Sequence, residues 1–139
     1  MQKKYFLMFI SLVFVIGCSA PEKTFKDGEI ILKKLSAEKL GSPIQIFYNS
    51  DSTFALNIRQ DKSSSRNPNP SLNFFVYNIK IAKIIFEDSV PAGSAAWINN
   101  DEIEVRLTPG IVSSNDANRL FGYIYNVKSG KKSDLSPAQ

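Results

Sequence analysis

The sequence predicts a small, mostly β fold whose neighbouring strands run antiparallel. Two long stretches alternate apolar and polar residues with the period of half-buried strands, and short polar turns separate the strands within them. One strand-and-turn pattern also recurs 48 residues further along the chain. A chain of 139 residues suits one hydrophobic core. We therefore expect a single antiparallel meander or sandwich.

The chain begins with a short apolar run. Lys3 and Lys4 precede twelve uncharged residues, 5–16, and the run ends at Gly17 and Cys18, the only cysteine. A positive start, a short apolar core and a small-residue exit are typical of a secretory signal peptide. Twelve helical residues reach about 18 Å, against about 30 Å of hydrocarbon, which disfavours the alternative of an uncleaved membrane anchor. A second alternative is a buried free cysteine.

The segment Phe14–Cys18 resembles the lipobox of bacterial lipoproteins, where the chain is acylated and cleaved just before the cysteine. With its Asn-, Lys- and aromatic-rich strands, the chain is also similar to small exported lipoproteins of Bacteroidota. The resemblance implies a lipoprotein signal peptide over 1–17 and a lipid, such as palmitate, on Cys18. It further implies the outer membrane, because Ser19 rather than Asp follows the cysteine; the leaflet stays open.

Removal of this leader changes the charge balance. The remaining 122 residues have a formal charge of +2 instead of +4, because Lys3 and Lys4 are lost. So weak a basic excess argues against nucleic acid as a partner. With Cys18 acylated no disulfide can form, so stability depends on packing.

The first part of the exported chain is predicted to be a tether followed by a helix. Residues 18–28 are polar and contain Pro21, as expected for a lipid-anchored tether. Glu29–Leu40 has the loose periodicity of an amphipathic helix, although a strand beginning at Ile30 is an alternative. With so few apolar residues, this helix is expected to pack on the domain rather than lie on the membrane surface.

The strands follow from residue 44 onward. We expect a single β domain over 29–135 and a flexible tail over 136–139. Seven strands are predicted by alternation and by flanking turn residues, at 44–48, 54–58, 72–79, 83–86, 95–98, 103–107 and 120–127.

An internal repeat organises these strands. Residues 75–83 match residues 123–131 at an offset of 48, with four of nine positions identical. We also align Phe54, Leu56 and Ile58 with Ile103, Val105 and Leu107 at an offset of 49. The unit resembles a blade of a β-propeller, but four blades need about 160 residues. Duplicated blade-like units and a plain meander or sandwich both remain open.

Catalytic chemistry is poorly supported. The chain has no histidine, which excludes Ser-His-Asp and Cys-His catalysis, and it has no phosphate-loop or dinucleotide motif. We expect no cofactor, no metal and no enzymatic activity; a calcium site at Asn99–Asp101 lacks the ordered ligand pattern. The alternative is a carboxylate-dependent hydrolase acting on glycans through Glu102 and Glu104, whose simpler interpretation is a solvated strand face.

The aromatic residues offer a candidate binding face. If left open, it would bind a protein partner or a glycan, and if covered, the same residues would be core. Its members are Phe75, Tyr77, Trp97, Tyr123 and Tyr125. The leading expectation is thus a lipid-anchored cell-envelope protein, attached to the membrane through Cys18, that binds a protein partner or an envelope component without catalysis.

Overall fold

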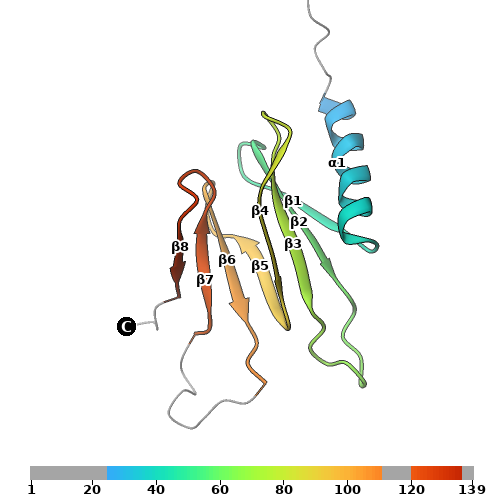
Figure 1. Cartoon of the computed structure of the whole chain (residues 1–139), viewed down its shortest axis with the longest axis vertical. Coiled ribbons are helices and arrows are strands. Elements are labelled where there is room, and N and C mark those ends of the chain that lie inside the picture. Colours follow the sequence, from blue (N-terminus) through green and yellow to red (C-terminus); the bar gives the residue numbers. More distant parts are fainter. Residues whose placement is uncertain (1–24, 111–119, 136–139) are drawn as a thin grey trace, which may run out of the picture.

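The structure, a computed structural model, describes residues 25–110 and 120–135 and confirms the mostly β fold (Figure 1). The elements in chain order are α1 (Phe25–Leu40), β1 (Gln45–Tyr48), β2 (Phe54–Gln60), β3 (Leu72–Asn78), β4 (Lys83–Val90), β5 (Gly93–Trp97), β6 (Glu102–Leu107), β7 (Gly122–Asn126) and β8 (Lys132–Asp134). The predicted signal peptide (1–17), Cys18 and the predicted tail (136–139) lie outside the described residues.

The described part of the chain has three layers. Sheet A contains β1–β4 and sheet B contains β5–β8, and in each sheet the strands lie in sequence order and pair antiparallel. Helix α1 covers the face of sheet A that points away from sheet B (Figure 1). Sheet A is therefore the middle layer.

Helix α1 forms because Leu32, Leu35 and Leu40 lie on one side of the helix and pack against sheet A. It begins at Phe25, so residues 25–28 are helical rather than part of the predicted tether, and the alternative strand at Ile30 does not form. Within the described residues, no helix is long and apolar enough to cross a membrane.

The helix ends at a glycine in the left-handed conformation. Gly41 has φ +78° and donates its N–H to the carbonyl of Ala37 at 2.9 Å, which is the usual way to close a last turn. The guanidinium of Arg59 on β2 donates to the last helical carbonyl, that of Leu40, at 2.9 Å. This bond ties the end of α1 to sheet A.

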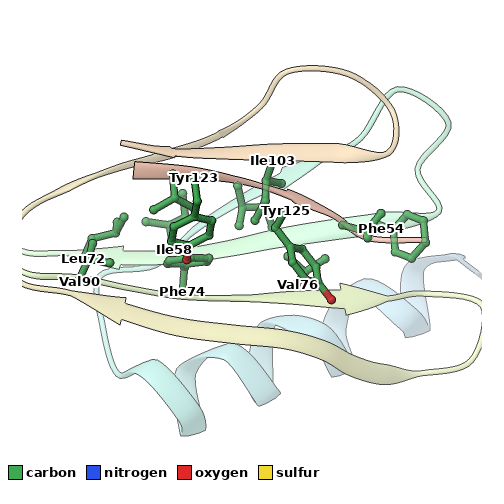
Figure 2. Packing of buried hydrophobic residues seen from close by; sticks show 12 residues of the cluster. Phe54, Ile58, Leu72, Phe74, Val76, Val90, Ile103, Tyr123 and Tyr125 are labelled. Atoms are coloured by element: carbon green, nitrogen blue, oxygen red, sulfur yellow. The ribbon is translucent and has the colours of Figure 1, made fainter. Parts of the chain in front are cut away.

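The main core lies between the two sheets. Even-numbered residues of β2 and β3, such as Phe54 and Phe74, point toward sheet B and meet Ile103 and Tyr123 (Figure 2). Figure 2 labels nine of the side chains of this inter-sheet core, and α1 lies beyond sheet A on the far side. A second, smaller core between α1 and sheet A contains Leu32, Ala55, Phe75 and Tyr77.

A buried polar contact sits inside this smaller core. The Ser36 hydroxyl of α1 lies 2.8 Å from Oδ1 of Asn57 on β2 and 2.7 Å from the carbonyl of Leu32, and both polar residues are fully buried. The Asn57 amide donates to the carbonyl of Ala55 at 3.0 Å. The polar atoms are thus bonded, as burial requires.

The two sheets repeat one plan, and their two central strands keep a single offset. Leu56 pairs with Val76 in sheet A, and Glu104 pairs with Ile124 in sheet B, so the offset is 48 in both strands. The predicted offset of 49 for the earlier strand is wrong. The predicted alignment matched apolar residues with apolar residues, which assumes that equivalent positions of the two units face the inter-sheet core. In the structure, even-numbered residues of β2 and β3 face this core from sheet A, and odd-numbered residues of β6 and β7 face it from sheet B.

Strand ends differ from the prediction where pairing overrides local pattern. β4 continues to Val90 because β3 pairs along its full length, and β7 begins only at Gly122. Strand β8 was not predicted, since Lys132–Asp134 is polar throughout, and it forms by pairing with β7. Backbone pairing can recruit a segment that has no apolar alternation of its own.

Candidate functional site

The aromatic residues predicted as a candidate binding face do not form an open face. Phe75 and Tyr77 lie under α1, whereas Tyr123 and Tyr125 lie between the sheets, and all four are buried. Trp97 is partly buried and packs against the inter-sheet core. These residues are therefore core, because α1 covers Phe75 and Tyr77, and sheet A covers the face of sheet B that carries Tyr123 and Tyr125.

Tyr123 instead fastens sheet B to sheet A. Its hydroxyl donates to Oδ2 of Asp88 on β4 at 2.5 Å, and the Lys132 ammonium lies 3.1 Å from the same oxygen and 3.7 Å from the centre of the Tyr123 ring. Burial, then the neighbouring carboxylate, raises the pKa of Tyr123. Burial alone would raise the pKa of Asp88, but the bonds from Tyr123, Ser89 and Lys132 outweigh it and lower that pKa.

The two glutamates of the hydrolase alternative lie on the outer face of sheet B. Glu102 accepts from the amides of Asn99 at 2.7 Å and Asn126 at 3.3 Å, and Glu104 is paired with Arg106. Neither glutamate lines any of the three surface hollows described below. Their arrangement is that of a bonded, solvent-facing strand surface.

The turns at one end of the sheets also bind one another. Asp51 and Asn100 exchange two hydrogen bonds, at 3.2 and 2.7 Å, and Asn49 donates to the carbonyl of Asn100 at 2.8 Å. Asp101 is paired with Lys128 at 2.8 Å. Among the described residues, no three His, Cys, Asp or Glu side chains are grouped as a metal site would require.

The outer edge of β1 is a different kind of surface. Asn49 donates its N–H to Phe54 at 3.1 Å, and bonded pairs alternate along an antiparallel ladder, so the N–H and C=O of Ile46 point away from β2. β1 ends the strand order of sheet A. Phe47, on the sheet face opposite α1, is 47% exposed, and its carbonyl accepts from the Trp97 indole at 2.9 Å.

A groove runs between this edge and the first half of α1. Its volume is about 440 Å³, its floor is formed by the half-buried side chains of Ile44, Ile46 and Tyr48, and its wall carries Glu29 and Lys33, paired at 2.8 Å. Two other hollows, of about 370 and 210 Å³, are lined mainly by polar and charged residues. The β1 groove is thus distinguished by its apolar floor.

The other strand edges are less suited to pairing. β8 consists of Lys132, Ser133 and Asp134, all exposed, and β4 carries Glu87 and Asp88; charged edges of this kind disfavour strand addition. β5 offers mostly small side chains. β1, with the sequence Gln-Ile-Phe-Tyr, has no charge on it. Of the described edges, β1 therefore combines outward backbone groups with apolar side chains.

Comparison with known proteins adds little. No protein-family model and no curated protein matches the chain. Among solved structures it is similar to Pyrococcus horikoshii acylaminoacyl peptidase (orthorhombic crystal form), with 18% sequence identity and a TM-score of 0.46. The match covers 70% of this chain and 19% of the peptidase chain, so this chain spans about a fifth of that protein.

Proposed function

We propose that this protein is a lipid-anchored module of the bacterial cell envelope, attached to the outer membrane through Cys18, that binds a polypeptide partner along the edge of β1. The β1 edge and its apolar groove are the observation that carries the binding proposal. The apolar run that ends at Cys18 supports the anchor. Helix α1 begins seven residues after Cys18, so the domain would stand close to the membrane.

Binding at this edge would use strand addition. An extended peptide pairs its backbone with the outward N–H and C=O of Ile46, which supplies affinity without regard to sequence. Alternate side chains of the peptide then point into the groove beside Ile44 and Tyr48, which supplies selectivity for apolar residues. The charged pair of Glu29 and Lys33 borders the groove and sets the polarity of its rim.

The proposed role is non-enzymatic. The chain has no histidine, and Glu102 and Glu104, the best acid–base candidates in the sequence, are each bonded on an open sheet face. A glycosidase pair stands across a cleft that holds a sugar. Binding rather than turnover is the task that the surface of the described domain supports.

The anchor is tested by substituting the lipidated residue. In cells fed a labelled fatty acid, the wild-type protein should incorporate label and partition into detergent, and Cys18→Ala should do neither. Ser19→Ala is the matched control, because it changes the neighbouring residue and leaves the thiol in place. Labelling of the Cys18→Ala protein, or absence of label on the wild type, would refute the anchor.

The binding edge is tested with a proline that removes an outward donor of β1 together with the Ile46 side chain of the groove floor. Ile46→Pro abolishes the outward N–H while the bonded pairs with β2 remain, and Asp134→Pro does the same on the edge of β8. Wild type and Asp134→Pro should retain the same partner from detergent-solubilised membranes, and Ile46→Pro should lose it. Equal retention by all three proteins would exclude β1 as the site. Thermal unfolding checks that each variant is folded.

A further inference from the structure

The geometry points to a second copy of this chain as the partner of the β1 edge. In this arrangement two β1 strands pair antiparallel about a two-fold axis that passes beside Ile46, and the two A sheets join into one continuous sheet. The inference rests on the proposed function, because it names the partner of the same edge.

The backbone of β1 is complementary to itself. Because the N–H and C=O of Ile46 both point outward, each Ile46 donates to the carbonyl of the other and accepts from its N–H. This register places Gln45 of one copy opposite Phe47 of the other, and Ile44 opposite Tyr48. Two-fold pairing of this kind uses the same surface on both copies, so it closes as a dimer.

The side chains beside the edge also suit a second copy. Residues opposite one another in an antiparallel pair lie on the same sheet face. The groove residues Ile44, Ile46 and Tyr48 of the two copies would therefore form one apolar strip on the α1 side of the joined sheet. Burying that strip removes half-exposed apolar surface from water, which favours association.

The charges on the groove wall are arranged to match their own two-fold image. Glu29 and Lys33 are one helical turn apart on α1, and the two-fold axis reverses their order in the second copy. Glu29 of one copy then faces Lys33 of the other, and the same holds for the second pair. An unrelated peptide would have to supply both charges in the right order, whereas a second copy supplies them by symmetry.

The pairing is expected to be weak in dilute solution and favoured at the membrane. β1 has only four residues, so the contact is shorter than that of most stable dimers. Two molecules attached to one membrane have a high effective concentration, which raises the paired fraction without any new contact. The test is therefore made in membranes with the full chain.

Cysteine cross-linking distinguishes this pairing from other outcomes. Residues in a bonded antiparallel pair have Cα atoms about 5.5 Å apart, within disulfide range. With a mild oxidant, membranes carrying Ile46→Cys should therefore give a disulfide-linked dimer. Its mass should be twice that of the processed chain, which is the 15.5 kDa of the full chain less the leader. Asp134→Cys, on the edge of β8, should stay monomeric. Equal cross-linking of both variants, or none of Ile46→Cys, would overturn the inference.

The wild-type protein in the same experiment reports on the anchor separately. Cys18 is the only natural cysteine, and acylation would leave it no free thiol to oxidise. Cross-linking of the wild type would therefore show failure of the proposed anchor rather than of β1 pairing. If Ile46→Cys stays monomeric while Ile46→Pro loses a different protein in the membrane pull-down, the binding function stands and self-pairing is overturned.

A charge exchange separates a second copy from any other occupant. In the Ile46→Cys background, Glu29→Lys places like charges across the two-fold axis and should lower the cross-linking rate about two- to ten-fold. Adding Lys33→Glu again places opposite charges across the two-fold axis, with their order reversed, and should restore the cross-linking rate. A double variant as slow as Glu29→Lys would contradict the two-fold arrangement.

Discussion

Sheets A and B share one strand plan but differ in how many of their faces are covered. Sheet A lies between α1 and sheet B and has apolar residues on both faces, whereas the residues that the structure describes cover sheet B on one face only. At equivalent positions 48 residues apart, Leu56 is fully buried and Glu104 is a partly exposed charge paired with Arg106. Two equivalent positions of the repeat therefore carry different residue types because their sheets occupy different layers of the molecule.

The largest test of this comparison uses those equivalent positions. Leu56→Ala should lower the free energy of unfolding by about 2–5 kcal/mol, because it leaves a cavity between the sheets. Glu104→Ala should lower it less, by at most about 1 kcal/mol, since the Glu104 side chain is 19% exposed and the Arg106 side chain that it pairs with is 58% exposed. Urea unfolding measures both. Similar losses from the two substitutions would show that the outer face of sheet B is covered.

A second test concerns the buried polar contact that only sheet A has. Ser36→Ala should cost about 1–3 kcal/mol, because it leaves Oδ1 of Asn57 buried and without its donor. The position equivalent to Asn57 in sheet B is Val105, which is buried and apolar. Adding Asn57→Val to Ser36→Ala should recover most of the loss in thermal unfolding. A double variant less stable than Ser36→Ala would show that the contact has a further role.

The smallest effect is expected at the turns that join the two units. Hydrogen bonds from Thr53 and then Asn100 lower the pKa of Asp51 to about 2. Because the folded pKa lies below the unfolded one, the stabilisation is present above about pH 4 and is lost as the pH falls toward about 2. Asp51→Asn should therefore show a shallower loss of stability over that range.

Urea unfolding at a series of pH values measures this difference. Asp61→Asn, in the exposed loop after β2, is the control for removal of a negative charge. If Asp51→Asn and the wild type lose stability in parallel below about pH 4, the bonds across the turns do not favour the ionised Asp51.

Local pattern predicted most of the fold. Alternation at Phe54, Leu56 and Ile58 predicted the strand, and Leu32 and Leu35 predicted the helix. The prediction that this strand has one buried face is wrong, because α1 covers its second face. Period-2 alternation says which residues share a face but not what lies opposite, so it could not tell that Phe75 points to a helix and Tyr123 to a sheet. The unpredicted strand β8 depends on its partner β7 for the same reason.

The candidate site was less predictable than the fold. Gln45–Tyr48 reads as an ordinary hairpin strand, and nothing in its residues shows that no described strand lies beyond it. Its lack of charge, beside Lys- and Asp-bearing edges such as Lys132–Asp134, was the available signal. The aromatic residues drew attention instead because large rings suit both cores and binding sites.

The outer face of sheet B is unsuited to the stacking of a further sheet. Surfaces that stack head to tail without closing a ring can propagate into fibres. Where sheet A offers Phe54, Leu56 and Ile58 to its neighbour, sheet B carries Glu102, Glu104 and Arg106. A further layer there would have to strip water from these charges, which is costly. We therefore expect these three charged residues to oppose the addition of a further layer.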